Sequence, residues 1–300
     1  MITIRGLQKR FHGNDALRGV DLDIPQGKVT AFLGPNGAGK TTTIKCAMNL
    51  IDRDAGEVSV METDARNLGR PQWQRIGYVS ENRTMPGWMT VPKLLDFVRP
   101  MYGEFWDRDF EKKLLAGFEL PLKTKLCNLS RGQKMKAALL AALAYRPQLI
   151  VLDEPFTGLD PLVRDEFLTG LLELTETEGW TVWISSHDIE EVERFADRVA
   201  ILNNGRVDLQ EDVETLQSRF RNVELWFDET ATLPGDLPTT WLNPQASGRT
   251  LRFTDSNHDE ASGHSLLDKF FPPAIRQETR RMTLREIFVA LARSYRINPN

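Results

Sequence analysis

The segment "KVTAFLGPNGAGKTT", residues 28–42, decides the fold class of this 300-residue chain. Its apolar first half predicts a short buried strand over residues 28–34. Residues 34–41 then match the pattern G-x-x-x-x-G-K-[ST], and a helix is expected to follow. Backbone N–H groups in such a loop wrap a phosphate, and the helix N-terminus adds positive potential. The segment therefore predicts a phosphate-binding loop in which Lys40 reaches the β- and γ-phosphates and the Thr41 hydroxyl ligates Mg²⁺.

Further short runs rich in β-branched residues alternate with segments long enough for helices. This alternation predicts an α/β fold with a mostly parallel sheet, because parallel strands need crossover connections. A run that is apolar throughout, such as "LIVL", is typical of a strand covered on both faces. The "NNG" at residues 203–205 predicts a hairpin turn. The strand candidates besides residues 28–34 are residues 76–80, 149–154, 181–186 and 198–202.

Polar side chains stand where two of these predicted strands end. Asp153 and Glu154 close the run over residues 149–154, and His187 directly follows the run over residues 181–186. There, Asp153 would lie beside Mg²⁺, Glu154 would polarise the attacking water, and His187 would contact the γ-phosphate and that water. The alternatives are solvated acids and a structural histidine, and the phosphate-binding loop disfavours both.

Residues 86–145 carry helical periodicity and few strand signals, which predicts a helical insertion. Within it, "LSRGQ" at residues 129–133 places Ser, Gly and Gln at a helix start, which is a second anion-binding arrangement. Trp88 is flanked by turn-forming residues and is the candidate for contact with a partner. We expect most of the other aromatic side chains of the early insertion to pack in its core; they are Phe97, Tyr102, Phe105 and Trp106.

After about residue 220 the pattern changes to a small α+β appendage, residues 220–300. Residues 223–227 and 250–254 alternate like strands, with a Pro- and Gly-rich segment between them. Thr283 and Glu286 form a capping-box pattern at the start of a helix with one apolar face. The end of the chain is locally basic, and a solvated helix face explains this better than a membrane contact. The basic side chains concerned are Arg276, Arg280, Arg281, Arg285, Arg293 and Arg296.

Composition narrows the function classes. The formal net charge is −4 at pH 7, so no strong positive field indicates nucleic acid as a partner. The longest purely apolar run, residues 137–145, is far shorter than the ~18 residues that a membrane span needs. The first residues carry no hydrophobic region of a signal peptide. Cys46 and Cys127 are predicted to be buried apolar residues, as in a protein of the reducing cytosol.

In order and spacing, these motifs resemble those of the ATPase subunit of an ABC transporter, over about residues 2–218. The resemblance implies a P-loop NTPase core with a mostly parallel sheet, an antiparallel β edge and a helical subdomain at about residues 86–145. Residues 1–218 would form this nucleotide-binding domain, and residues 220–300 an accessory region. The tail "MTLREIFVAL" also resembles the C-terminal end of subunits from the branch that mostly exports its substrates.

The same resemblance implies the ligands and their residues. In this family two ATPase domains meet head to tail, as a homodimer or a heterodimer. Each nucleotide lies between the phosphate loop of one domain and the signature loop of the other, and the resemblance makes "LSRGQ" at residues 129–133 the signature loop. Thr41, Asp153 and Glu81 would hold Mg²⁺, with Glu81 standing where the family usually has Gln, and Asn82 as the alternative. ATP would be bound by Phe11 against adenine, by Gly34, Asn36, Gly37, Ala38, Gly39, Lys40, Thr41 and Thr42, and in trans by Ser130, Gly132, Gln133 and Asp160.

The function expected from the resemblance is ATP hydrolysis that powers transport, with export as the expected direction. Glu154, His187 and Lys40 are the catalytic candidates. The partner would be a separate transmembrane permease, which would bring this cytoplasmic chain to the inner face of the cell membrane. One alternative is a soluble ABC-type ATPase acting on ribosomes or DNA. Another is a regulator that binds ATP without useful turnover.

Overall fold

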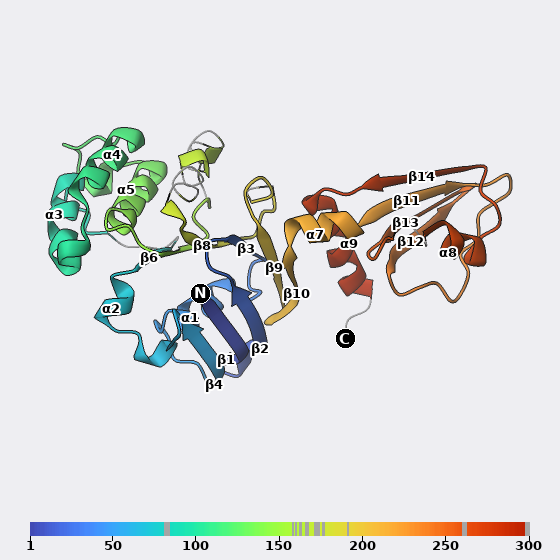
Figure 1. The fold of residues 1–300 in the computed structure, drawn as a ribbon, viewed down its shortest axis with the longest axis horizontal. Coiled ribbons are helices and arrows are strands. Elements are labelled where there is room, and N and C mark those ends of the chain that lie inside the picture. The colour runs from blue at the N-terminus through green and yellow to red at the C-terminus, as the bar shows by residue number, and fades with distance from the viewer. Residues whose placement is uncertain are drawn as a thin grey trace. The chain divides into compact units, whose positions relative to one another are not determined.

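The computed structural model describes residues 1–80, 85–157, 159, 161, 164–165, 168–170, 175, 178–190, 192–259 and 263–297. The chain divides into two compact units, Met1–Gln210 and Glu211–Asn300, whose elements are shown in Figure 1. Within the described part of the chain, no helix has the length and apolar character needed to cross a membrane.

The first unit is built around a six-stranded sheet with the order β10-β9-β3-β8-β7-β6. β3 lies between β8 and β9 and is parallel to both, while β7 is parallel to β6 and β8. The mostly parallel sheet is therefore confirmed. β3, β7 and β8 are buried along their whole length, which explains their continuous apolar character. The strands are β3 (Val29–Leu33), β6 (Ile76–Ser80), β7 (Leu149–Asp153), β8 (Thr181–Ser186), β9 (Arg198–Asn203) and β10 (Arg206–Asp212).

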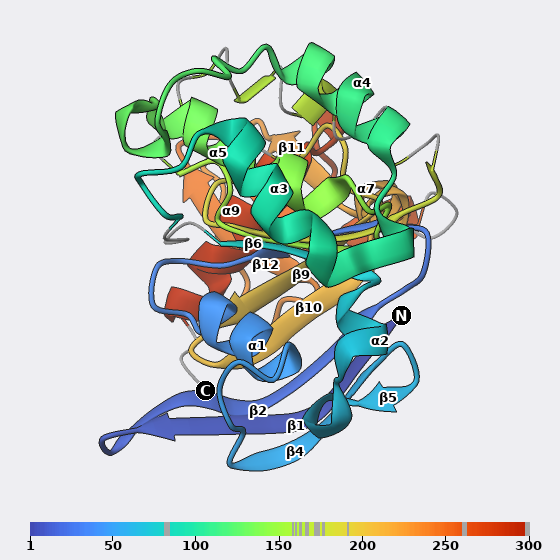
Figure 2. The ribbon, with the colours of Figure 1, turned by 90° about the vertical axis from the view of Figure 1, so that its left-hand side faces the viewer.

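A second, antiparallel sheet forms the β edge of this unit, with the order β2-β1-β4-β5. Figure 2 shows α1 (Lys40–Ala47) between the two sheets, where Ile44, Cys46 and Ala47 join the apolar core. This packing fixes the start of α1, and with it the phosphate-binding loop. The strands are β1 (Ile2–Phe11), β2 (Asn14–Ile24), β4 (Ala55–Val60) and β5 (Thr63–Asp64), and α2 (Arg70–Trp73) precedes β6.

The predicted helical insertion is present between β6 and β7. It contains α3 (Val91–Tyr102), α4 (Arg108–Phe118) and α5 (Arg131–Leu143), and α5 contacts α3, α4 and β6. Asp107 caps α4 by accepting from the backbone N–H groups of Asp109 and Phe110. The contact with β6 joins the insertion to the central sheet.

Three burial predictions within the insertion were wrong. Phe97 is 53% exposed and Phe105 is 44% exposed, so neither lies in a core, whereas Trp106 is buried. Cys127 is exposed as well, while Cys46 is buried as expected. Residues on the outer face of a short helix meet solvent whatever their polarity, and composition alone does not show which face is outward.

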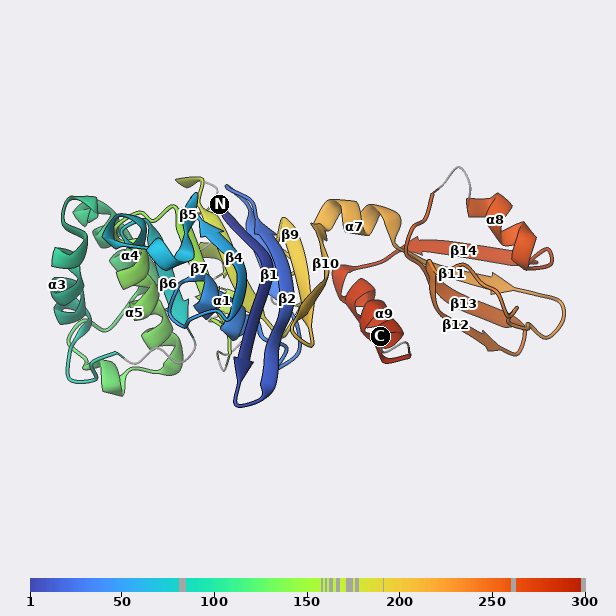
Figure 3. The same cartoon turned by 90° about the horizontal axis from the view of Figure 1, so that it is seen from below.

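The second unit holds an antiparallel sheet with the order β12-β13-β11-β14. Figure 3 shows α8 (Gly263–Phe270) alongside these strands. One face of the sheet forms a separate apolar core, whose buried members are Val223, Leu225, Phe227, Trp241, Leu251, Phe253 and Phe271. The strands are β11 (Arg221–Trp226), β12 (Trp241–Ser247), β13 (Thr250–Asp255) and β14 (Arg276–Arg281), with α7 (Val213–Arg219) before them and α9 (Leu284–Ile297) after them.

The α+β character of this unit was expected, but the prediction that its basic side chains lie on a helix face was wrong in part. Arg276, Arg280 and Arg281 lie on strand β14 rather than on a helix face. The capping box is confirmed, since the Thr283 N–H donates to Glu286 Oε2 (3.0 Å) and the Glu286 N–H donates to Thr283 Oγ1 (3.2 Å).

Candidate nucleotide site

The loop between β3 and α1 is confined by its neighbours. A Cβ atom at Gly34 would lie 2.3 Å from the Leu202 carbonyl oxygen. At Gly39, where φ is +110°, it would lie 2.7 Å from Leu17 Cδ2 and 2.9 Å from the Ala16 carbonyl oxygen. Only glycine fits such close approaches of backbone to backbone. β2 and β9 therefore hold the loop in its shape.

Lys40 is the first residue of α1, and its side chain is only 5% exposed. Its ammonium group donates to the carbonyl oxygen of Gly34 (2.7 Å) and that of Pro35 (3.3 Å). The same Nζ lies 3.0 Å from Glu154 Oε1. Lys40 therefore presents its charge inside the loop, where a phosphate would lie.

Asp153 ends β7 and receives hydrogen bonds from two neighbouring elements. The hydroxyl of Thr41 donates to Asp153 Oδ1 at 3.0 Å, and the hydroxyl of Ser185 donates to the same oxygen at 2.8 Å. Burial raises the pKa of Asp153 above its ordinary value, although these two hydrogen bonds act in the opposite direction. Hydroxyl and carboxylate oxygens at this separation are the ligand types that Mg²⁺ prefers.

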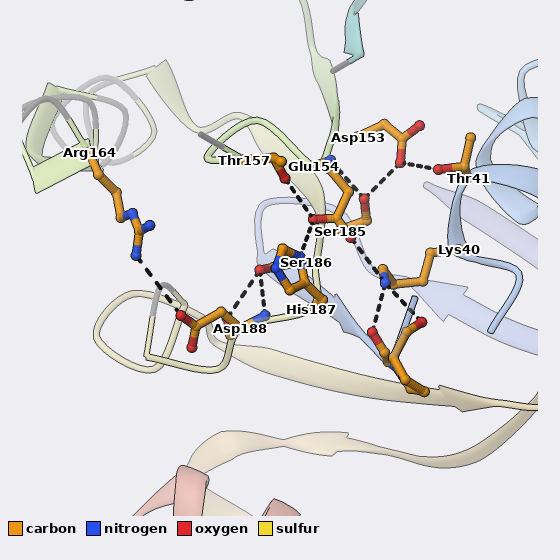
Figure 4. Close-up of polar contacts among 12 residues, drawn as sticks. Lys40, Thr41, Asp153, Glu154, Thr157, Arg164, Ser185, Ser186, His187 and Asp188 are labelled. Carbon is orange, nitrogen blue, oxygen red and sulfur yellow. Dashed lines mark hydrogen bonds and ion pairs between the residues drawn. The ribbon is translucent and has the colours of Figure 1, made fainter. Parts of the chain in front are cut away.

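Glu154 follows Asp153 with φ at +52°, a backbone conformation that a residue with a side chain rarely adopts. Its N–H donates to Ser185 Oγ (2.9 Å), and its Oε2 lies 2.8 Å from His187 Nδ1. Figure 4 shows the carboxylate between Lys40 and His187. Burial acts to raise the pKa of Glu154, but hydrogen bonds from His187 and Lys40 outweigh it and leave this pKa below its ordinary value. The carboxylate is thus held in the ionised form that a base requires.

These groups open into a cavity of about 530 Å³. Gly34 and Ala38, which were predicted to bind ATP, do not line it. Asp153 does not line it either, but it accepts a hydrogen bond from Thr41, which does. The predicted residues that line it are Asn36, Gly37, Gly39, Lys40, Thr41, Thr42, Glu154 and His187.

The sequence did not reveal a second wall of this cavity. Asn14, Asp15, Ala16 and Arg18 come from β2, and Asn204 and Gly205 come from the turn between β9 and β10. The turn is fixed by two backbone bonds, from the Gly205 N–H to the Ala38 carbonyl (3.0 Å) and from the Arg18 N–H to the Gly205 carbonyl (2.8 Å). The "NNG" signal predicted the turn, but only the fold brings it to the phosphate loop.

Several predicted site residues lie elsewhere. Ser130 and Gln133 form a capping box at the start of α5, and neither they nor Gly132 line the cavity. Phe11, at the end of β1, is 41% exposed and does not line it either. Glu81 and Asp160 lie outside the described residues, as does Asn82, the alternative to Glu81.

Two sheets, a helical insertion and a phosphate loop in this arrangement define a P-loop ATPase of the ABC class. A sequence profile described as "ABC transporter" matches residues 17–157. The chain is 29% identical to the ABC transporter ATP-binding protein YtrB of Bacillus subtilis, over 78% of this chain and 79% of that protein. It is 38% identical to the sulfate/thiosulfate import ATP-binding protein CysA of Xylella fastidiosa, over 69% of this chain, but spans only 62% of that protein.

Solved structures agree with these sequence relatives. An ATP-binding subunit of an ABC transporter superposes with a TM-score of 0.65 at 26% identity, over 73% of this chain and 92% of that chain. A dimeric bacterial ABC transporter cassette superposes with a TM-score of 0.64 at 26% identity, over 71% of this chain and 98% of that chain. Together these comparisons support an ATP-binding subunit of an ABC transporter, an ATPase that hydrolyses ATP for transport.

Proposed function

We propose that Glu154 is the general base with which this chain hydrolyses ATP. The observation that carries the proposal is the position of its ionised carboxylate, 3.0 Å from Lys40 Nζ and 2.8 Å from His187 Nδ1. Lys40 is the residue that binds the β- and γ-phosphates, so ATP would replace Glu154 as its partner. Glu154 would then be free to take a proton from a water that His187 orients.

Mg²⁺ fits beside this base. Thr41 Oγ1 and Asp153 Oδ1 lie 3.0 Å apart and would hold the ion, with Glu81 as the further ligand. When bound, the ion neutralises charge on the β- and γ-phosphates. The protein's own part is to position these oxygens: Ser185 donates to Asp153 Oδ1, and so does Thr41.

The working unit is a dimer in which each chain completes the other's site. This proposal is supported by the absence of Ser130, Gly132 and Gln133 from the residues lining the chain's own cavity. They stand at the N-terminus of α5, where backbone N–H groups and positive potential suit a γ-phosphate from a second chain. A related cassette has been solved as a dimer. The second chain would be a copy of this one or a different ATPase subunit.

The transport partner is a separate transmembrane permease, which would hold the chain at the inner face of the cell membrane. Trp88 supports this, because its large apolar side chain is 65% exposed at the edge of the helical insertion. We propose export as the direction, on the resemblance of residues 282–291 to the exporter branch. The alternative is import, because the chain is similar to a sulfate/thiosulfate import protein. Transport assays in oriented vesicles distinguish the two directions.

Glu154→Gln tests the base directly. The amide keeps the size of the side chain but cannot accept a proton, so we expect turnover to fall by about 10²–10⁴-fold while ATP still binds. Dimers should accumulate with Mg·ATP, as size-exclusion chromatography would show. Glu57→Gln is the matched control, since Glu57 is an exposed glutamate on β4. Turnover equal to wild type in Glu154→Gln would remove the proposed role.

A further inference from the structure

The C-terminal unit has a second face of its sheet that the apolar core does not use. Strand alternation places Val223 and Leu225 in the core, so Asn222 points to the opposite face. In the register of the sheet, Asn222 pairs with Thr254 on one side and with Arg280 on the other, and Gln245 pairs with Arg252. Polar and basic groups from all four strands of this sheet therefore share one surface.

Helix α9 encloses part of this surface. It contacts β12, and Asn243 Nδ2 of that strand donates to the Ala290 carbonyl at 2.6 Å. Arg285, Val289 and Arg293 follow one another at four-residue spacing, so they lie on one stripe of the helix. Sheet and helix together enclose a cavity of about 510 Å³, a size that suits a small molecule.

The charge of this cavity is unbalanced. Arg252 and Arg280 enter it from the sheet, Arg285 and Arg293 enter it from the helix, and Glu286 is its single acidic lining residue. Glu286 pairs with Arg280 and Glu224 pairs with Arg252, so the four arginines still outnumber the carboxylates that pair with them here.

Two of these guanidinium groups are held in place by ion pairs. Arg280 contacts Glu286 Oε1 at 2.7 Å and Oε2 at 3.0 Å, and Arg252 lies 2.5 Å from Glu224. The hydrogen bond from Arg280 is the main reason that the pKa of Glu286 is lowered, so this carboxylate stays ionised and keeps the arginine oriented. A fixed planar guanidinium binds the oxygens of a phosphate bidentately, at a lower entropy cost than a mobile one.

We propose that this arginine-lined cavity binds a phosphate group, carried by a small molecule in solution or by a lipid headgroup. The four arginines supply the charge, and Asn222, Thr254 and Gln245 supply further polar contacts from the sheet. The site is separate from the nucleotide cavity, because every residue that lines it belongs to the unit Glu211–Asn300. It does not depend on the proposed roles of Glu154 or of the dimer.

Isothermal titration calorimetry of the full chain with inorganic phosphate tests the proposal. Phosphate also suits the loop around Lys40, so wild type should show two binding events. Lys40→Ala should lose one, and Arg285→Gln/Arg293→Gln should weaken the other at least tenfold. Arg276→Gln is the matched control, because Arg276 is an exposed arginine of β14 that does not line the cavity. This control should keep both events.

The lipid source is tested by co-sedimentation with phosphatidylcholine vesicles, with and without phosphatidic acid. Binding that needs phosphatidic acid and is lost in Arg285→Gln/Arg293→Gln would support the proposal with a lipid as the source. Circular dichroism shows whether that variant folds, and Arg252→Gln probes the same cavity from the sheet if it does not. If these cavity variants match wild type toward both free phosphate and vesicles, the proposal is overturned.

Discussion

Asp153 is a buried acidic group whose charge the fold holds at a cost. Burial raises its pKa, so the ionised form is less favourable in the folded chain than in the unfolded chain. Asp153→Asn removes the charge and keeps an oxygen that accepts from Thr41 and Ser185. We expect the variant to be more stable by about 1 kcal/mol, or ~2–4 °C in the melting temperature. It should also lose Mg·ATP-dependent stabilisation. Thermal unfolding with and without Mg·ATP measures both effects.

The pH dependence of that gain has a definite sign. A carboxyl group with a raised folded pKa destabilises the fold at pH values above that pKa and has no effect below its unfolded pKa, near 3.8. The advantage of Asp153→Asn should therefore be greatest above the raised folded pKa and fade as the pH falls toward 3.8. An advantage that grows on acidification would contradict the burial explanation.

Which site residues could be predicted depends on how each reaches the site. Lys40, Asp153, Glu154 and His187 follow buried parallel strands, and such strands end at one edge of the sheet, so local motifs predict their meeting. Arg18 carries no such signal, because only the pairing of β2 with the turn after β9 brings it to the cavity. Residue patterns therefore predict site residues that stand at strand ends, and they miss cavity-lining residues that only tertiary packing brings to the site.

At the scale of elements, the junction of β3 and α1 is the most tightly constrained. Gly39→Ala would place a Cβ against Leu17 and Ala16 at a φ of +110°, so we expect a loss of about 2 kcal/mol or more. Gly37→Ala is the control in the same loop, because its φ of +83° is also strained but its Cβ would meet nothing within 4 Å. It should cost about 1 kcal/mol. Chemical denaturation of both variants measures the difference, and equal losses would contradict the packing argument.

The elements that were predicted are those whose environment imposes a pattern. β3, β7 and β8 are buried on both faces, so each reads as a continuous apolar run. β14 is exposed along its whole length and, among the described strands, pairs with β11 alone, so its sequence "RQETRR" carries no alternation. β12 contains Pro244, which is a poor strand signal. Exposed edge strands follow from the pairing of their neighbours rather than from their own residues.

At the scale of the whole molecule, the two units have separate cores. The core around Phe32 and Trp183 belongs to the first unit, and the core around Trp241 and Phe253 belongs to the second. We expect scanning calorimetry to show two transitions, because units with their own cores unfold independently unless a large interface joins them. A non-hydrolysable ATP analogue with Mg²⁺ should raise only the transition of the first unit. A single transition that shifts as a whole would show that the units unfold together.

The proposed dimer predicts that two inactive variants restore each other. Lys40→Ala disables the phosphate loop, and Ser130→Asp keeps a good helix cap on α5 while placing a negative charge toward the partner's γ-phosphate. The Ser130→Asp chain keeps an intact phosphate loop, and the Lys40→Ala chain keeps an intact signature loop. In a mixed dimer these two loops face each other and form one intact site. Random pairing should return roughly a quarter of wild-type turnover if each site acts alone. If Ser130 instead served its own chain's nucleotide, the equimolar mixture would remain as inactive as either variant, so the ATPase rate of the mixture decides between the two arrangements.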